Sequence, residues 1–248
     1  MEENKFKLPT ETIELPSKGY LYPKDHPLHN GKIEIKYMTA KEEDILTNQN
    51  YIKNGTVIDK LLKSLIITEF DYDDLFIGDK NAIMIAARIL AYGADYEIEY
   101  QGIKQSIDVN QIQSKPLHFS ITRGSNNHFE YTLPYSGNKI TFKILSQKDE
   151  NRIDAEIKGL QKINKDNTNE ITTRLSTMIT SINESTEAKD IKDFVKNYFL
   201  SKDARAFRLH YNEISPDINL KIPVMTQDGE EDIDLPIGLS FFWPDSRA

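Results

Sequence analysis

The sequence predicts an α+β protein with two helical blocks, a small antiparallel β unit between them and a C-terminal β-hairpin. Apolar residues recur at helical spacing in most of 33–94, after a short alternating stretch at 33–37, and again through 147–214. Between these blocks, and after residue 214, the apolar period changes to two, which is typical of strands. The expected organisation begins with an arm (1–32), a helical block (33–94) and a β unit (95–146). A second helical block (147–214) and a hairpin with an aromatic tail (215–248) follow.

The first 32 residues are expected to form an ordered arm. Four prolines oppose a helix and favour extended or turn conformations. The interleaved Leu15, Tyr20 and Tyr22 make this segment more apolar than a disordered tail. We therefore expect an extended segment that packs on another surface, followed by a short strand at 33–37.

Three helices are expected in the first block. Thr39 and Glu42 have the spacing of a capping box, which marks the start of one helix. Thr56 precedes a second helix, which has an apolar stripe on one face. A third helix, from about residue 80 to 92, is apolar nearly all round and has Gly93 as its C-terminal cap. Because of this composition, we expect the third helix to be central in the fold.

Five short strands with alternating apolar residues are expected in the β unit, at 96–100, 107–109, 117–121, 129–133 and 139–145. Gly and Asn residues mark the turns between them. The second helical block is predicted to hold helices at 147–164 and 170–183 and two more that Thr186 and Ser201 cap.

The dipeptide at Asp228 and Gly229 is a strong hairpin signal and lies in the final alternating segment. The order of helices followed by strands occurs twice along the chain. No internal repeat of fixed period is apparent.

The end of the chain is unusually apolar, with Phe241, Phe242 and Trp243 in a row. A run of this kind needs a surface to lie on. Either it folds back as a terminal strand on its own domain, or it docks on another protein. We favour the first alternative, because ordered termini are usually tied into a sheet.

Composition narrows the classes of function. The net charge of −8 disfavours nucleic acid and anionic membranes as partners, and it suits a basic protein partner. The absence of cysteine excludes disulfides, zinc–thiolate sites, iron–sulfur clusters and cysteine nucleophiles. No secretory signal is apparent, and the apolar stretch 82–92 is too short to span a bilayer. We therefore expect a soluble protein that is intracellular at synthesis.

Motifs for catalysis or cofactor binding are missing, including glycine-rich phosphate loops and nucleophile elbows. His26 and His29 form at most an incomplete metal site, and solvated loop histidines explain them better. The acidic runs 71–74 and 228–232 lack the frame of a calcium loop. We therefore predict no catalytic residue, no cofactor and no metal.

An enzymatic alternative is a hydrolase that uses Asp73, Asp74 and His118, which must then converge in one cleft. A cationic helix face offers a different site, with Arg205 and Arg208 one turn apart. Surface ion pairs explain this face in the simplest way. A contact surface is the functional alternative, since Arg is enriched at protein interfaces.

Several segments, read in order, resemble one family, the baseplate hub subunits or hub assembly proteins of T-even-like myophages. The segments are 15–23 (LPSKGYLYP), 37–46 (YMTAKEEDIL), 53–62 (KNGTVIDKLL), 73–75 (DDL) with 78–88 (GDKNAIMIAAR), 193–198 (DFVKNY), 201–206 (SKDARA) and 236–244 (PIGLSFFWP). Together they extend over almost the whole chain.

The resemblance implies a late structural or assembly protein of a contractile phage tail, made in the host cytoplasm and then located in the baseplate of the virion tail. Its partners would be other hub or spike proteins of the baseplate. Relatives often carry pairs of cysteines at β turns, in the manner of a zinc ribbon. This chain has none, so no zinc is expected. An assembly chaperone absent from the mature virion and a non-viral adaptor are the other protein-binding alternatives.

On this interpretation the protein acts by binding other proteins, and aromatic or arginine side chains are the expected interface anchors. The candidate interface residues are Leu15, Pro16, Gly19, Tyr20, Tyr22, Arg205, Arg208, Phe241, Phe242 and Trp243.

Overall fold

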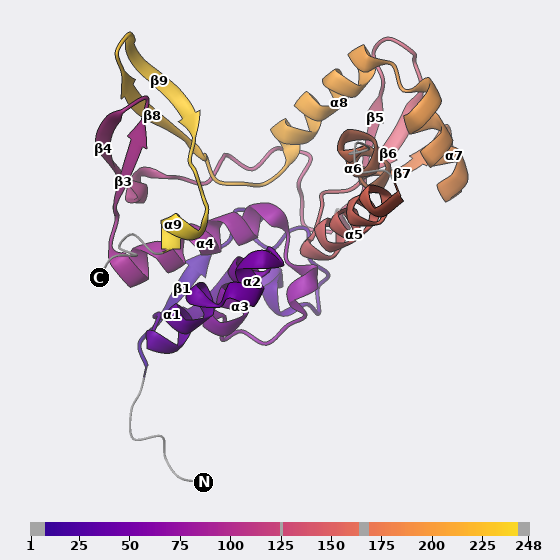
Figure 1. The fold of residues 1–248 in the computed structure, drawn as a ribbon. Coiled ribbons are helices and arrows are strands. Elements are labelled where there is room, and N and C mark those ends of the chain that lie inside the picture. The colour runs from indigo at the N-terminus through magenta and orange to yellow at the C-terminus, as the bar shows by residue number, and fades with distance from the viewer. Residues whose placement is uncertain (1–7, 125, 164–168, 243–248) are drawn as a thin grey trace.

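The computed structural model describes residues 8–124, 126–163 and 169–242, and it forms two lobes joined at their base (Figure 1). One lobe carries α1–α4 and the other carries α5–α8, while two hairpins, β3–β4 and β8–β9, stand side by side above α4 (Figure 1). The mixed α+β fold and the C-terminal hairpin predicted from the sequence are confirmed. None of the helices in the described part of the chain is long and apolar enough to cross a membrane.

The first part of the chain begins with a strand pair, continues with helices and ends in a hairpin. Its elements are β1 (Thr10–Glu14), the 3-10 helix η1 (Pro27–Asn30), β2 (Lys32–Lys36), α1 (Ala40–Thr47), α2 (Gln49–Lys53), α3 (Val57–Leu65), the 3-10 helix η2 (Tyr72–Asp74), α4 (Ile77–Tyr92), β3 (Asp95–Tyr100), β4 (Ile103–Asp108) and the 3-10 helix η3 (Val109–Gln111).

The second part follows the same order. Its elements are β5 (Phe129–Thr132), β6 (Lys139–Phe142), α5 (Gln147–Ile163), α6 (Glu170–Met178), β7 (Ile179–Ile182), α7 (Ala188–Asp193), the π-helical turn η4 (Phe194–Tyr198), α8 (Ser201–Ile214), β8 (Lys221–Thr226), β9 (Gly229–Asp234) and α9 (Leu239–Phe242).

The strand registers show that these two parts are versions of one unit. In the first, β1 pairs with β2 and the Leu15 amide donates to the Gly31 carbonyl at 2.8 Å. In the second, β5 pairs with β6 and the Leu133 amide donates to the Asn138 carbonyl at 2.8 Å. We call residues 10–109 unit 1 and residues 129–235 unit 2.

A third extended segment follows the helix after each strand pair. Ile66, directly after α3, bridges to Ile35 of β2 in unit 1. Ile179, directly after α6, pairs with Phe142 of β6 in unit 2. The two units therefore share strand order, register and helix placement, although the spacing between equivalent residues varies along the chain.

The two hairpins complete this correspondence. Each has two six-residue strands, and β3 and β8 bury the same alternate positions. The hairpins are also joined to each other, because the Gln105 side chain accepts from the Met225 amide at 2.8 Å and donates to its carbonyl at 3.3 Å. One hairpin from each unit thus contributes to a common layer.

The segment expected to be an arm is ordered, and the surface it packs on is the core of unit 1. Its strand β1 is extended as expected, while Leu15, Leu21, Tyr22 and Leu28 lie in the core. The Nδ1 atom of His26 accepts from the Leu28 amide and so caps η1. The prolines shape a folded loop rather than a projecting segment.

Several predictions of secondary structure are wrong. The residues that precede α7 and α8 are Glu187 and Leu200, and not the predicted caps Thr186 and Ser201. Residues 117–121 form no strand, and the strands at 95–146 belong to two separate sheets. Ile179–Ile182 is strand β7 and not the end of a helix, because it completes the sheet beside β6. The aromatic end forms the short helix α9 and not a terminal strand.

Helix α4 is central, as its composition predicted, with Ile83, Ile85 and Ala87 among its many buried side chains. It begins at Ile77, a few residues earlier than expected, and Gly93 caps its end. The predicted pair at the start of α1 is also present, since Glu42 accepts from both the amide and the hydroxyl of Thr39.

Candidate functional site

The first turn of α4 is the point where distant parts of the chain meet. Asp79, the third residue of this helix, is completely buried. Its carboxylate accepts from the Ser17 amide at 2.9 Å, the Ser17 hydroxyl at 2.7 Å and the Tyr22 hydroxyl at 2.8 Å. A buried carboxylate needs such partners, and the helix N-terminus adds favourable partial charge. The Asp79 side chain therefore attaches the loop 15–22 to α4.

Burial has a clear electrostatic effect at this carboxylate. Desolvation raises the pKa of Asp79 to about 6, and the hydrogen bonds from Ser17 and Tyr22 oppose that increase. Burial and the nearby Asp79 carboxylate raise the pKa of Tyr22 well above its ordinary value, so the phenol keeps its proton and acts as a donor.

The same turn of α4 also holds unit 2. A Cβ atom at Gly78 would overlap the carbonyl oxygen of Pro216, so only glycine allows this approach. Next to it, the Asn81 side chain donates to Asp217 at 3.0 Å. The Gln147 amide, at the start of α5, donates to the Leu75 carbonyl at 2.8 Å. The start of α4 is thus the main attachment point between the units.

Unit 2 has an equivalent carboxylate at the start of α8. Asp203 is the third residue of that helix and is completely buried. It accepts from the Tyr135 amide at 2.8 Å and the Ser136 amide at 3.0 Å. Tyr135 follows Leu133 and Pro134 just as Ser17 follows Leu15 and Pro16. A Leu-Pro turn held by an aspartate is therefore common to both units.

A second carboxylate motif is repeated at the first helix of each unit. In unit 1, Glu42 accepts from Thr39 and from the Lys36 ammonium. In unit 2, Asp149 accepts from Ser146 and from the Lys143 ammonium. Burial alone would raise the pKa of Glu42. The hydrogen bonds that Glu42 accepts from Lys36, Ser64 and Thr39 outweigh this effect and lower the pKa to about 2.

The aromatic end of the chain packs on unit 1. Phe241 and Phe242 are completely buried, and the Phe241 ring meets Tyr96 of β3 edge-on at a centroid distance of 5.0 Å. The Tyr96 hydroxyl donates to the Pro236 carbonyl at 3.4 Å. The tail therefore folds back on its own chain, as predicted, but in helical form. Trp243 lies outside the described residues.

The predicted interface residues that the structure describes fall into three groups. Most of them are covered by this chain itself, namely Leu15, Pro16, Gly19, Tyr22, Phe241 and Phe242. Tyr20 is half-buried, with the Arg123 guanidinium over its ring at 5.1 Å. Arg205 and Arg208 are exposed on α8. An intermolecular role stays a prediction for all of them, and the exposed pair fits it best.

The residues of the hydrolase alternative have separate surroundings. Asp73 accepts from Asn151, and Asp74 lies 3.7 Å from the His26 ring. The His118 ring lies 4.1 Å from the Phe119 ring and is tilted against it, in the connection between the units. No hydrogen bond or ion pair among described residues joins His118 to either aspartate.

The other predicted histidine sites are engaged in the fold of unit 1. Apart from its role in capping η1, the His26 ring stacks on Tyr22 at 4.7 Å. The Nδ1 atom of His29 lies 3.1 Å from the Tyr22 carbonyl oxygen and donates to it. Among the described residues, no group of three or more potential metal ligands comes together.

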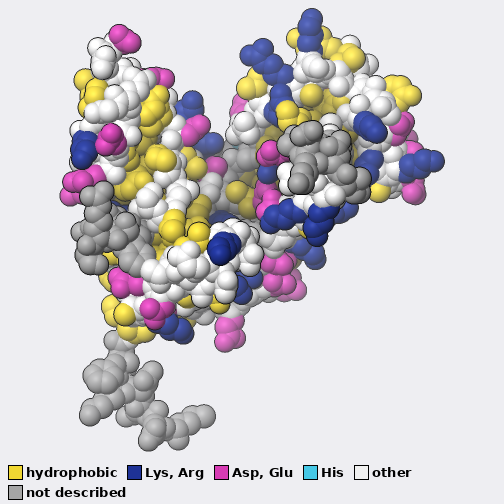
Figure 2. Space-filling view, viewed as in Figure 1, with side chains coloured by type: hydrophobic (Ala, Val, Ile, Leu, Met, Phe, Trp, Pro, Cys, Tyr) yellow, Lys and Arg dark blue, Asp and Glu magenta, His cyan; other side chains and the backbone are white. Residues whose placement is uncertain are grey.

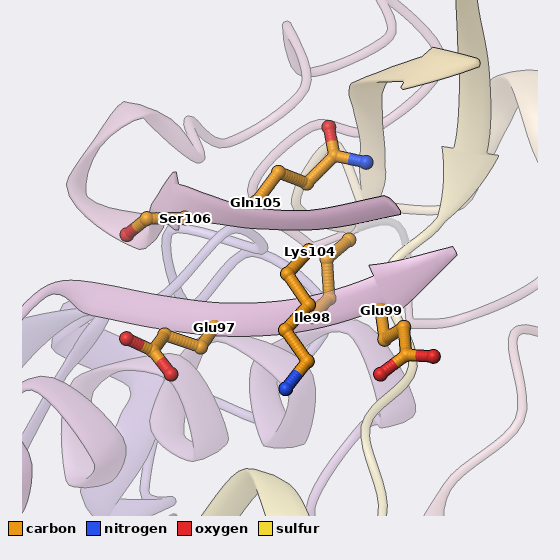
Figure 3. Close-up of a pocket in the computed structure, with 6 residues that line it drawn as sticks. All are labelled: Glu97, Ile98, Glu99, Lys104, Gln105 and Ser106. Carbon is orange, nitrogen blue, oxygen red and sulfur yellow. The ribbon is translucent and has the colours of Figure 1, made fainter. Parts of the chain in front are cut away.

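A surface depression of about 380 Å³ lies on the β3–β4 hairpin (Figure 3). The Lys104 ammonium projects between the carboxylates of Glu97 and Glu99 (Figure 3). Glu99 and Lys104 are cross-strand partners, and opposite charges at such positions stabilise a solvated hairpin. The depression is therefore a solvated, charged surface of the hairpin.

Sequence reasoning missed the residues that organise this site, which are Ser17, Gly78, Asp79 and Asp203. A usable signal was present, because LPSKG at 15–19 and LPYSG at 133–137 are similar turns. Each turn precedes a helix with aspartate at its third position.

The protein is thus built from two repeated units that share a hairpin layer and that each hold a loop by a buried carboxylate. The sequence profile of the family described as T4 bacteriophage base plate protein matches residues 9–243. The chain therefore belongs to this family and is a bacteriophage baseplate protein. No curated protein and no solved structure matches it significantly.

Proposed function

We propose that the chain is a structural subunit of the baseplate hub of a contractile phage tail and that it acts through protein–protein contacts, without an enzymatic step. The observation that carries the proposal is the family match, which extends over 9–243 and so includes both units. The family gives the location in the baseplate. The hub position and the hub or spike partners are the proposed part.

The architecture supports a role as a connecting element. The loop 15–22, α4 and the segment after α8 are joined by buried and partly buried hydrogen bonds and by the close approach at Gly78. Such contacts hold the two units in one relative placement, which a subunit that bridges neighbours requires. Exposed aromatic and arginine side chains on unit 2 supply anchors of the kind found at interfaces.

The proposal is tested by deleting the gene from the phage and supplying the protein from a plasmid. Without the protein, infected cells are expected to contain no complete baseplates in electron micrographs, and hub proteins should co-purify with the tagged protein when it is supplied. Normal baseplates in its absence would overturn the proposal.

A second measurement distinguishes a virion subunit from an assembly chaperone. Quantitative mass spectrometry is applied to purified virions and to baseplate intermediates. A subunit is present in both at a constant ratio to other baseplate proteins. A chaperone is present only in the intermediates, and that result would reject the structural role proposed here.

A further inference from the structure

The two units differ most in the loop between their first two strands. In unit 1 the loop comprises residues 16–30, between Leu15 and Gly31. In unit 2 it comprises only residues 134–137, between Leu133 and Asn138. Unit 1 thus carries an additional piece, residues 20–30, which we call the insert.

The insert covers the residue that precedes α4. Tyr22 of the insert meets the Phe76 ring edge-on at a centroid distance of 4.8 Å, and Phe76 is only 8% exposed. Leu21 and Leu28 of the insert are buried in the same core. An aromatic side chain on this loop therefore protects the start of α4 from water.

Within the part of the chain that the structure describes, the equivalent surface of unit 2 has no such cover. Leu200, which precedes α8 as Phe76 precedes α4, is 51% exposed. The neighbouring Tyr198 is 64% exposed, and Tyr135 of the short loop is 62% exposed. Leu209, two turns along α8, is also exposed. These four exposed side chains lie on α8 or next to it, Tyr135 through the hydrogen bond from its amide to Asp203, and we call them the α8 face.

Positive charge surrounds the α8 face. Lys202, Arg205 and Arg208 are exposed on α8, and none of them makes an ion pair with a described residue. Lys202 lies over the Tyr135 ring at 5.5 Å. Figure 2 shows basic and hydrophobic side chains interspersed over the end of the lobe that carries α7 and α8. A ligand that matches this surface has aromatic and acidic groups together.

We propose that the α8 face is a docking surface for an aromatic peptide segment flanked by acidic residues, supplied by another baseplate protein. The aromatic residue takes the place on Leu200 that Tyr22 takes on Phe76, and the acidic residues pair with Lys202, Arg205 and Arg208. The inference rests on the proposed function, because the peptide segment is taken to belong to one of the proposed baseplate partners. Its test uses purified protein and peptide, so it fails or succeeds independently of particle assembly.

The probe is a labelled synthetic peptide, EEYLYPEE, which places the insert's own Tyr-Leu-Tyr-Pro between acidic residues. Its binding to the full chain is measured by fluorescence anisotropy. We expect it to bind at least about tenfold more tightly than KKYLYPKK or EEALAPEE, because both the charge and the aromatic groups contribute. The substitutions Arg205→Glu and Leu200→Ser should each weaken binding about tenfold.

The matched control is Lys104→Glu, which reverses an exposed charge on the β3–β4 hairpin of unit 1 and should leave binding unchanged. Circular dichroism confirms that each variant is folded. The proposal is overturned if no peptide binds, if the acidic and basic peptides bind equally, or if single-stranded oligo(dT) displaces the acidic peptide. It is also overturned if sedimentation shows self-association that Leu200→Ser abolishes, since the occupant is then a second copy of this chain.

Discussion

Unit 1 and unit 2 have the same strand register, the same Leu-Pro turn and the same buried aspartate, yet their surfaces differ. In unit 1 the insert and the tail cover the central helix, so that α4 is buried on nearly every side. In unit 2 the equivalent helix, α8, exposes one face with Leu209 and Arg205. The shared hydrogen bonds maintain the unit, whereas the insert and the tail decide which face of the central helix is exposed.

The largest expected difference between the units concerns the residue before each central helix. Phe76→Ala should lower the free energy of unfolding by about 3–5 kcal/mol, because it empties a site that Tyr22 and the core enclose. Leu200→Ala should change it by less than about 0.5 kcal/mol, because that side chain is half exposed. Urea unfolding measures both. Equal losses would show that the start of α8 is covered as well.

A pH dependence should follow from the buried Asp79. Its pKa in the folded protein is about 6, above the ordinary value of 3.8, so between these pH values the folded state holds a proton that the unfolded chain has released. The free energy of unfolding should therefore decrease as the pH rises from about 4 to 6, by about 3 kcal/mol at most. Urea unfolding across this range tests it.

The control for this pH effect is Asp79→Asn, which keeps an acceptor for the Ser17 amide but has no titrating group. The decrease between pH 4 and 6 should become smaller in this variant. Glu42 acts in the opposite direction at lower pH, since its pKa of about 2 means that its stabilisation is lost as the pH falls from about 4.5 to 2. An unchanged profile in Asp79→Asn would contradict the assignment.

The equivalent carboxylate of unit 2 should be important for stability as well. Asp203→Ala removes a buried carboxylate, leaves the partly buried amides of Tyr135 and Ser136 without this acceptor and should cost about 1–3 kcal/mol. Asp203→Asn retains one acceptor oxygen and should cost less. Hydrogen exchange followed by mass spectrometry would report faster exchange in 133–137 for the alanine variant. Unchanged exchange there would mean that Asp203 does not hold the turn.

The smallest expected difference in stability concerns the second residue of α4 and of α8. Gly78→Ala places a methyl group against the Pro216 carbonyl and should cost about 1–3 kcal/mol. Lys202→Ala, at the same position of α8, removes an exposed side chain and should be nearly neutral. Thermal unfolding of both variants checks this difference. A neutral Gly78→Ala would indicate that the two units do not approach each other as closely as described.

Much of this fold could be predicted because its elements carry strong local patterns. The capping pair at Thr39 and Glu42, the apolar helix ending at Gly93 and the hairpin near Gly229 each depend on neighbouring residues alone. The family resemblance, confirmed at the level of the baseplate, came from segments distributed over the whole chain.

The parts that were missed depend on distant contacts. The repetition of the unit was hidden because the loop after Leu15 is much longer than the loop after Leu133, so no fixed period exists. Ile179–Ile182 follows a helical pattern, but the free edge of β6 makes it a strand. An aspartate in the first turn of a helix is also common in sequences, because its negative charge interacts favourably with the helix dipole. Only the structure shows that Asp79 and Asp203 are buried and hold equivalent turns.

If unit 1 organises the molecule and the α8 face of unit 2 meets a baseplate partner, Lys202 should lie against a carboxylate of that partner. Zero-length carbodiimide cross-linking of isolated baseplates, followed by mass spectrometry, detects such a contact because this reagent joins lysines only to carboxylates that touch them. We expect a link from Lys202 to an aspartate or glutamate of another baseplate protein. Links to other proteins that come only from lysines of unit 1, such as Lys60, with Lys202 unlinked, would show that the partner binds elsewhere.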